Sequence, residues 1–462
     1  MSELASLATD GTTSGFARKL GLFDVTMIVI GGIVGAGIFM NPSVVANQVH
    51  TTALILGAWL LGGVVALIGA FIYAELAWRF PKVGGQYVYI REAYHPLPAF
   101  MYGWSALLVI QTGGMAAVAV TFARYFLELV PVDVSDSFVA VLTIIVLTVI
   151  NCLGVRSGTT TQNVLMMLKI LAIAMLAGIA LVMVRVSHLS FQPIVDRPVS
   201  IGLVTAFGAA MVPVLFAYGG WQTSNFVAGE IRNPRKILPR GLILGVIGVV
   251  VLYLVVNLVC VHALGVSGLA GTSAPASAVM RLALGDRGAQ FIAVGIAIST
   301  LGFLSQTMLT APRLYYAMAQ DGLFFKSVAR LSPRTHTPVA AIILQGIITS
   351  VIALSGRYDQ ILNYVVSADF IFFGLTATCV HVFRRRDGMN TPGFLQARHE
   401  GERMSVRTPG YPLATVFFTS VCWLVVANDV YSYPANTMIG IVLVLSGIPA
   451  YYFWKWWNRK GE

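Results

Sequence analysis

The sequence has few charged residues and few cysteines. Charged residues make up only 11% of the 462 residues, whereas hydrophobic residues make up 57% and the mean hydropathy is +0.79. This composition excludes a soluble globular domain and is typical of a polytopic membrane protein. All four cysteines lie in or beside apolar segments, so no disulfide framework is expected. They are Cys152, Cys260, Cys379 and Cys422.

Sequence motifs of catalysis are also missing. The chain contains no HExxH, GxSxG or Walker-type pattern, and its seven histidines are scattered. These motifs would supply a metal-bound water, a nucleophilic serine or a phosphate-binding loop. We therefore expect neither an enzyme nor a resident metal or other cofactor. A repeated filter sequence, as a channel would need, is not visible either.

Long apolar runs dominate the chain instead. Twelve of them are long enough to cross a bilayer, so we expect an all-α polytopic membrane protein with twelve transmembrane helices. Their approximate ranges are 22–49, 53–78, 98–127, 138–154, 162–185, 201–226, 240–265, 289–318, 338–356, 359–383, 411–428 and 434–456.

The net charge of +11 is explained by topology. Of the 30 Lys and Arg residues, 22 fall before span one, after an even-numbered span or at the C-terminus, and six fall in the opposite loops. By the positive-inside rule both termini are cytoplasmic. Anionic lipid is a plausible partner of these charges, whereas no nucleic acid is needed to explain them.

The stretch Gly31–Asn41 (GGIVGAGIFMN) interrupts the first span with four glycines. Each glycine costs roughly 1 kcal/mol relative to alanine in a helix interior, so the helix is expected to stop and restart here. Free N–H groups at the restart suit a carboxylate, and free carbonyls before it suit an ammonium. An amino acid carries both charges. The alternative is that these glycines only allow two helices to pack closely.

Span six carries a counterpart, FAYGGWQTSNF from Phe216 to Phe226, with Pro213 before it. Interrupted helices that come first in each of two five-span halves indicate an inverted-repeat transporter with a midplane site, as in leucine transporters. We therefore divide the chain into a cytoplasmic N-terminus (1–21), a first repeat (22–185), a second repeat (201–383), a cytoplasmic loop (384–410), spans eleven and twelve (411–456) and a cytoplasmic C-terminus (457–462).

Three motifs resemble a known family. GGIVGAGIFMNP, YAELAWRFPKVGGQYVYIREAY and FAYGGWQTSNFVAGEIRNPRKILPR are similar to segments of the amino acid–polyamine–organocation superfamily, and most of all to its L-type amino acid transporter branch. The resemblance covers nearly the whole chain. It implies a leucine-transporter-like fold of five plus five spans, with broken first and sixth helices and an amino acid as substrate.

The resemblance also implies which groups bind this substrate. Its carboxylate would meet the N–H groups of Gly35, Ala36 and Gly37, and its ammonium the carbonyls of Ile33, Phe216, Ala217 and Gly219. The ring of Phe216 would be an aromatic gate over the substrate. Trp221 and Gln222 either line the pocket or pack beside it.

Lys169 lies about 10 Å into span five, at 1.5 Å per residue. An ionisable residue at this depth is a functional candidate, although its long stem could also reach the interface. In sodium-independent relatives such a lysine puts its ammonium where related transporters bind sodium. The resemblance therefore implies a bridge from span one near Gly35 to a hydroxyl of span eight, Ser305 or Thr307. Proton transfer by Lys169 stays open.

Asp369 in span ten departs from the family pattern, because L-type relatives often have a neutral polar residue there. A carboxylate facing the substrate is compatible with a proton carrier or with preference for a basic substrate. Pairing with Lys169 or with a backbone donor is the structural alternative. Glu75 and Glu230, near the cytoplasmic ends of spans two and six, are expected to form inner-gate or structural salt bridges.

The function that follows is sodium-independent exchange of neutral L-amino acids by alternating access, with spans 1, 2, 6 and 7 rocking against spans 3, 4, 8 and 9. A proton-coupled amino acid or polyamine symporter and a non-transporting amino acid sensor are the alternatives. Animal L-type members bond to a heavy chain through a cysteine after span three. Residues 128–137 contain none, so we expect no covalent heavy chain and a bacterial inner-membrane location.

Overall fold

A computed structural model describes residues 16–185, 187–198, 200–355, 358–388, 406–432 and 434–459. Within these ranges the regular elements are helices, and the only pairing of extended backbone is a single parallel bridge between Leu20 and Ile231. Most of the predicted N-terminal segment 1–21 and of the predicted loop 384–410 lies outside the described residues. The expectation of an all-α protein is confirmed.

The helices follow the predicted apolar runs in order. The first five runs contain α1 (Leu22–Ile33) with α2 (Gly37–Gln48), α3 (Thr52–Arg79), α5 (Pro96–Ser105) joined to α6 (Gln111–Leu129), α7 (Asp136–Cys152) and α8 (Val155–Met183). The next five contain α9 (Ile201–Ala217) with the 3₁₀ segment η2 (Trp221–Glu230), α10 (Pro234–Ala270), α12 (Asp286–Thr310) with α13 (Pro312–Gln320), α14 (Val339–Leu354) and α15 (Tyr358–Gly388). The last two contain α17 (Leu413–Ser432) and α18 (Pro434–Leu445) with α19 (Gly447–Arg459).

The predicted count of twelve spans is confirmed only in part. Among the described residues, nine helical segments are long and apolar enough to cross a membrane, or ten if α1 and α2 form one bent span. The remaining two predicted spans contain α7 and α14, which are apolar but only 17 and 16 residues long. At 1.5 Å per residue they rise about 25 Å, a little less than a typical hydrocarbon core.

Two short helices lie in connections between the predicted spans. α4 (Gln86–Ala93) begins after Gly84 and Gly85, whose φ angles of 97° and 46° favour glycine. α11 (Pro275–Leu284) lies in the loop before α12. Burial, and then the neighbouring Asp321 carboxylate, raise the pKa of Tyr87 in α4 above its usual value. Its hydroxyl therefore stays protonated and donates to Asp321 over 2.6 Å, which ties α4 to the end of α13.

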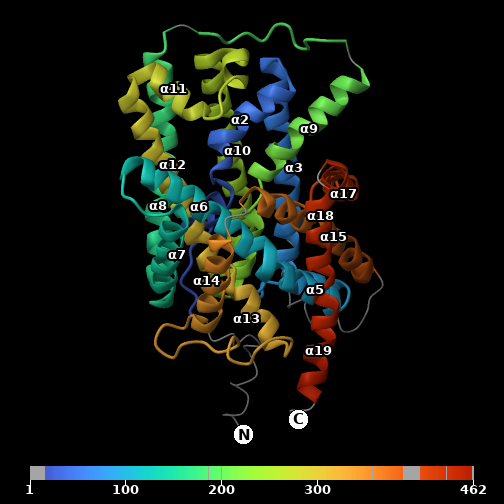
Figure 1. The fold of residues 1–462 in the computed structure, drawn as a ribbon. Coiled ribbons are helices and arrows are strands. Elements are labelled where there is room, and N and C mark those ends of the chain that lie inside the picture. Colours follow the sequence, from blue (N-terminus) through green and yellow to red (C-terminus); the bar gives the residue numbers. More distant parts are fainter. Residues whose placement is uncertain are drawn as a thin grey trace.

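The helices form one bundle around a continuous hydrophobic core (Figure 1). α3 and α10 pack along each other, and α12 packs against both α6 and α8. α2 and α11 lie at one end of the molecule, and α13 and α19 extend to the other (Figure 1). Phe16 stacks edge-on against Tyr316 of α13, with ring centroids 4.9 Å apart. The first and last described segments therefore lie at the same end of the molecule.

Candidate functional site

The first span breaks where the glycine cluster predicts it. α1 ends at Ile33 and α2 begins at Gly37, with a 45° bend between the two helices. Gly35, Ala36 and Gly37 precede or open α2, so their N–H groups lack acceptors within the helix and lie at the positive end of its dipole. A Cβ on Gly35 would meet only the Phe303 ring, at 3.8 Å. The break thus offers donors and space to a small anion.

The sixth span is interrupted as well. α9 ends at Ala217, and a turn through Gly219 and Gly220 leads into η2. Gly220 has a φ of 108°, which a residue with a side chain rarely adopts. Phe216 is 36% exposed although it lies beside the break in mid-span, whereas Ala217 is buried. The partly exposed Phe216 ring is compatible with the predicted gate over the substrate.

Two carbonyls of these breaks share one hydroxyl. Tyr253 of α10 is buried, and its hydroxyl lies 3.1 Å from the Ile33 oxygen and 3.1 Å from the Ala217 oxygen. One hydroxyl has one proton, so it donates to only one of the two carbonyls at a time. The Phe216 carbonyl, also predicted to bind the substrate ammonium, accepts the N–H of Gly219 over 3.0 Å. Tyr253 could not be recognised from the sequence, because a tyrosine in an apolar span looks like any core aromatic.

Trp221 and Gln222 hold the second break in place. Gln222 accepts the Gly220 N–H through its side-chain oxygen over 2.9 Å. The ring of Trp221 is 3% exposed and packs between Tyr73, at 4.7 Å, and Phe373, at 5.7 Å. Of the two roles considered for these residues, packing beside the pocket fits these contacts better than lining it.

Lys169 of α8 reaches the first break. Its ammonium donates to the Val34 carbonyl, the side chain is fully buried, and its stem runs past Gly302 of α12. The side chain is thus directed to the break and not to the end of α8. From span eight, the Ser299 hydroxyl donates to the Gly35 carbonyl over 3.3 Å.

The span-eight hydroxyls predicted for Lys169 have other surroundings. The Thr307 hydroxyl donates to the Phe303 carbonyl over 3.1 Å, and the buried Ser305 hydroxyl has no hydrogen-bond partner among the described residues. Ser299 was missed because serine is common in apolar spans, and only the fold shows which serine faces the break.

Asp369 of α15 has no hydrogen-bond partner for its buried Oδ1 within the described part of the chain. One turn later on α15, Phe373 packs on the Tyr73 ring at 6.4 Å and Phe372 packs on the Tyr102 ring at 5.2 Å. Tyr73 is also the residue that packs against Trp221 after the second break. Asp369 is thus linked to the candidate site through Tyr73 and Trp221.

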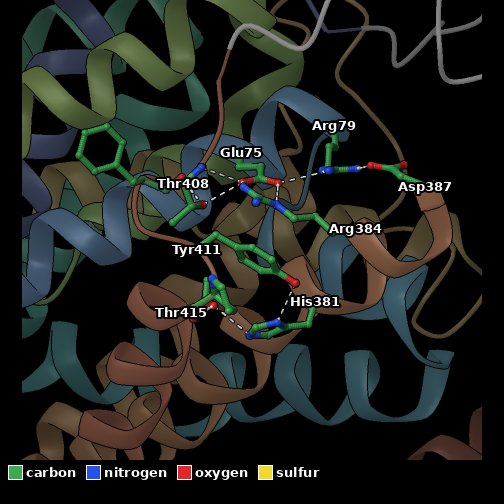
Figure 2. A network of polar contacts seen from close by, with 10 residues as sticks. Glu75, Arg79, His381, Arg384, Asp387, Thr408, Tyr411 and Thr415 are labelled. Carbon is green, nitrogen blue, oxygen red and sulfur yellow. Dashed lines mark hydrogen bonds and ion pairs between the residues drawn. The ribbon is translucent and has the colours of Figure 1, made fainter.

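Glu75 of α3 is the centre of a network of polar contacts (Figure 2). Arg384 of α15 binds its carboxylate through two nitrogens at 2.9 and 2.6 Å, and Thr408 donates through its N–H at 2.8 Å and its hydroxyl at 2.9 Å. Arg79 adds a contact at 3.2 Å and also binds Asp387 at 2.8 Å. The carboxylate of Glu75 is fully engaged and joins α3, α15 and the segment before α17.

Glu230 at the end of η2 forms the second buried ion pair. Its carboxylate accepts from the Nε of Arg313 in α13 over 2.7 Å, and both side chains are at most 1% exposed. Its backbone carbonyl accepts the N–H groups of Lys19 and Leu20 at 2.8 and 2.9 Å. The two buried glutamates therefore form salt bridges, one that joins α3 to α15 and one that joins η2 to α13.

Comparison with known proteins identifies the family. The amino acid permease family matches residues 20–448. The cystine/glutamate transporter of Homo sapiens is 29% identical over 450 residues, which cover 96% of this chain and 86% of that protein. The b(0,+)-type amino acid transporter 1 of Oryctolagus cuniculus is 31% identical over 386 residues, 80% of this chain and 77% of that protein. The large neutral amino acids transporter small subunit 2 of Mus musculus is 27% identical over 469 residues, 99% and 84% of the two chains.

These matches confirm the resemblance to the amino acid–polyamine–organocation superfamily and its L-type branch, as well as the expectation of a transporter and not an enzyme. The chain belongs to the amino acid permease family and is an integral membrane transporter of amino acids.

Proposed function

We propose that the chain exchanges neutral L-amino acids without sodium, by alternating access. The observation that carries the proposal is the contact of the Lys169 ammonium with the Val34 carbonyl in the break of span one. A fixed cation at this carbonyl takes the role that the resemblance assigns to sodium in related transporters. Transport then needs no sodium gradient, and exchange of one amino acid for another is the simplest cycle left.

The substrate pose follows from the two breaks. The carboxylate binds the N–H groups of Gly35, Ala36 and Gly37 at the start of α2. The ammonium binds the carbonyls of Ile33, Phe216, Ala217 and Gly219, where the Ile33 and Ala217 carbonyls share the one proton of the Tyr253 hydroxyl. The substrate ammonium has three donors, so it replaces the single Tyr253 proton and satisfies both carbonyls at once. The ring of Phe216 covers the bound amino acid.

Alternating access follows from the inverted repeat proposed for 22–185 and 201–383. Spans 1, 2, 6 and 7 move as a bundle against spans 3, 4, 8 and 9. The contact of Lys169 with Val34 joins span five to the bundle, and the contact of Ser299 with Gly35 joins span eight to it. Both contacts end on the break itself, so substrate bound there influences both.

We further propose that the chain works without a disulfide-linked heavy chain, in a bacterial inner membrane with both termini in the cytoplasm. One relative is named a small subunit, but here the outer segment between α6 and α7, 130–135, contains no cysteine. The four cysteines are free, and three of them are buried. The basic loops favour the cytoplasmic side for the end that carries α13.

Uptake into proteoliposomes tests the proposal. Labelled neutral amino acid is offered without sodium, to vesicles with and without internal amino acid, at two pH gradients. Uptake that requires internal substrate and is not driven by the pH gradient supports exchange. Uptake into empty vesicles driven by an inward proton gradient supports the symporter instead, and binding without any flux supports a sensor.

A further inference from the structure

A second group of polar side chains, the Asp369 cluster, lies beside the candidate site. Four helices contribute to it: Tyr73 comes from α3, Tyr102 from α5, Asp369 from α15 and Cys422 from α17. One turn after Asp369 on α15, Phe373 packs on the Tyr73 ring at 6.4 Å and Phe372 packs on the Tyr102 ring at 5.2 Å. On the same turn, a Cβ added at Gly374 would stand 3.5 Å from the Cβ of Cys422. The two tyrosines and the cysteine are at most 1% exposed.

One polar atom of this cluster is buried without a partner. Among the described residues, Asp369 Oδ1 has no hydrogen-bond partner. A buried carboxylate oxygen without a cationic partner is costly in the anion, and a neutral carboxyl group both donates and accepts hydrogen bonds.

The other acidic groups near these helices are already paired. Glu75 follows Tyr73 by two residues on α3, and Arg384, Arg79 and Thr408 bind its carboxylate. Asp429 follows Cys422 by two turns on α17, and the Ser367 hydroxyl donates to it over 2.9 Å. Asp369 thus differs from both in having no partner for one buried oxygen.

The chemistry of the Asp369 cluster favours a proton over a metal ion. Hard cations such as Ca²⁺ and Mg²⁺ need six or so oxygen ligands, several of them charged or carbonyl. Within the described residues no three His, Cys, Asp or Glu side chains converge on one point. A single carboxyl group beside phenol hydroxyls is sufficient for a proton.

Ring contacts connect the Asp369 cluster to the break of span six. The Tyr73 ring packs edge-on against Trp221 at 4.7 Å, and Trp221 stacks on Phe373 of α15 at 5.7 Å. An ionised Asp369 would draw water between α3 and α15 and separate these rings. A neutral Asp369 is compatible with the packed arrangement seen here.

We propose that Asp369 is a proton-binding site, distinct from the amino-acid site, whose protonation holds α3 and Trp221 against α15 and so makes transport depend on pH. The inference needs the chain to be a transporter, but it does not need exchange or any particular substrate. If exchange passes through the packed state, its rate falls as the pH rises and Asp369 ionises.

The test is homoexchange of leucine in proteoliposomes at a series of equal internal and external pH values. The exchange rate of wild type is expected to fall with rising pH by up to about tenfold per pH unit, the slope that titration of a single proton gives. Asp369→Asn is expected to lose this falling limb of the pH profile. Asp429→Asn, the matched control at a buried acid that is already hydrogen-bonded, is expected to keep it. A wild-type rate independent of pH, or a limb that survives in Asp369→Asn, would overturn the proposal.

Infrared spectroscopy of the purified full-length protein gives a second test that does not depend on transport. A protonated-carboxyl band at neutral pH is expected in wild type, absent in Asp369→Asn and shifted in Tyr73→Phe. No such band in wild type would overturn the proposal even if exchange is observed. If leucine is not exchanged at any pH, the band still decides the proton site, whereas the proposed exchange fails separately. If Asp369→Asn changes only the preference between leucine and lysine, Asp369 belongs to the amino-acid site and the proposal is wrong.

Discussion

Gly32 of α1 and Gly220 after α9 touch backbone to backbone. A Cβ on Gly32 would stand 2.5 Å from the Gly220 carbonyl oxygen, closer than real Cβ atoms come to other atoms. A Cβ on Gly220 would likewise collide with the backbone of Gly32, and the φ of 108° at Gly220 adds strain. The two interrupted spans therefore meet at a point where no side chain fits.

Gly32→Ala should consequently impair both stability and exchange. Overpacking a tight contact costs about 1–3 kcal/mol, and here the obstructing atoms belong to backbone that cannot rotate away. Thermal unfolding in detergent and exchange in proteoliposomes measure the two effects. Gly208→Ala on α9, where a Cβ would meet nothing within 4 Å, is the control and should behave like wild type. Equal behaviour of the two variants would mean that the backbones are farther apart than the structure has them.

Gly35→Val should abolish substrate binding while the protein still folds. The first carbon added at Gly35 meets only the Phe303 ring at an ordinary 3.8 Å, so the fold tolerates it. The two further methyl groups of valine take the space in front of the N–H groups that the substrate carboxylate needs. Substrate-dependent thermal stabilisation measures binding, and Gly35→Ala should show an intermediate loss. Normal affinity in Gly35→Val would remove the carboxylate site from this break.

Lys169→Ala should reduce the exchange rate tenfold or more. A factor of ten in rate corresponds to about 1.4 kcal/mol of activation free energy. The substitution removes the ammonium that donates to the Val34 carbonyl and so removes one of the contacts that hold span one to α8. Exchange with and without sodium should be compared, because loss of the Lys169 ammonium leaves the Val34 carbonyl open to another cation. Ser299→Ala, which removes the contact with Gly35 but no charge, should have the smaller effect. Unchanged exchange in Lys169→Ala would leave this lysine a structural role only.

Glu75→Gln should destabilise the protein without a direct effect on substrate affinity. The buried carboxylate holds Arg384 and Arg79, and losing one partner of a buried pair costs about 3–5 kcal/mol. Asp387→Asn removes an acid that is 43% exposed and should cost less than about 1 kcal/mol. Thermal unfolding of both variants tests the difference. Comparable losses would show that Glu75 is less important than its contacts suggest.

The sequence predicted those parts of the fold that depend on composition and on local backbone preference. Apolar runs located the spans, and clustered glycines located the breaks after Ile33 and Ala217, because glycine weakens a helix whatever surrounds it. The span count was less secure, since α7 and α14 are too short to be assigned by length alone.

Side-chain contacts between distant spans could not be predicted in the same way. Lys169 stood out as a charge in an apolar run, but its partner Val34 depends on how α8 packs against the break. Tyr253 and Ser299 carry no local signal, since their importance comes only from the carbonyls that the breaks leave within their reach. Periodicity identifies a helix face, whereas a long-range hydrogen bond requires the packed bundle.

Tyr253→Phe tests whether the shared hydroxyl matters. The ring stays, so packing is retained, but the Ile33 and Ala217 carbonyls both lose their donor. A lost hydrogen bond at a buried group costs about 1–3 kcal/mol, so exchange should fall by about tenfold with little change in thermal stability when substrate is bound. The loss should be largest without substrate, because the substrate ammonium satisfies the same carbonyls.

Tyr218→Phe is the matched control for this substitution. Tyr218 is equally buried, its ring centroid lies 5.0 Å from that of Tyr253, and its hydroxyl donates over 3.1 Å to the Trp59 carbonyl of α3 and to none of the described carbonyls of either break. If both variants lose exchange to the same extent, the effect comes from the aromatic cluster as a whole. If only Tyr253→Phe loses exchange, the hydroxyl at the two breaks is part of the transport cycle, because it holds the empty site until a substrate ammonium replaces it.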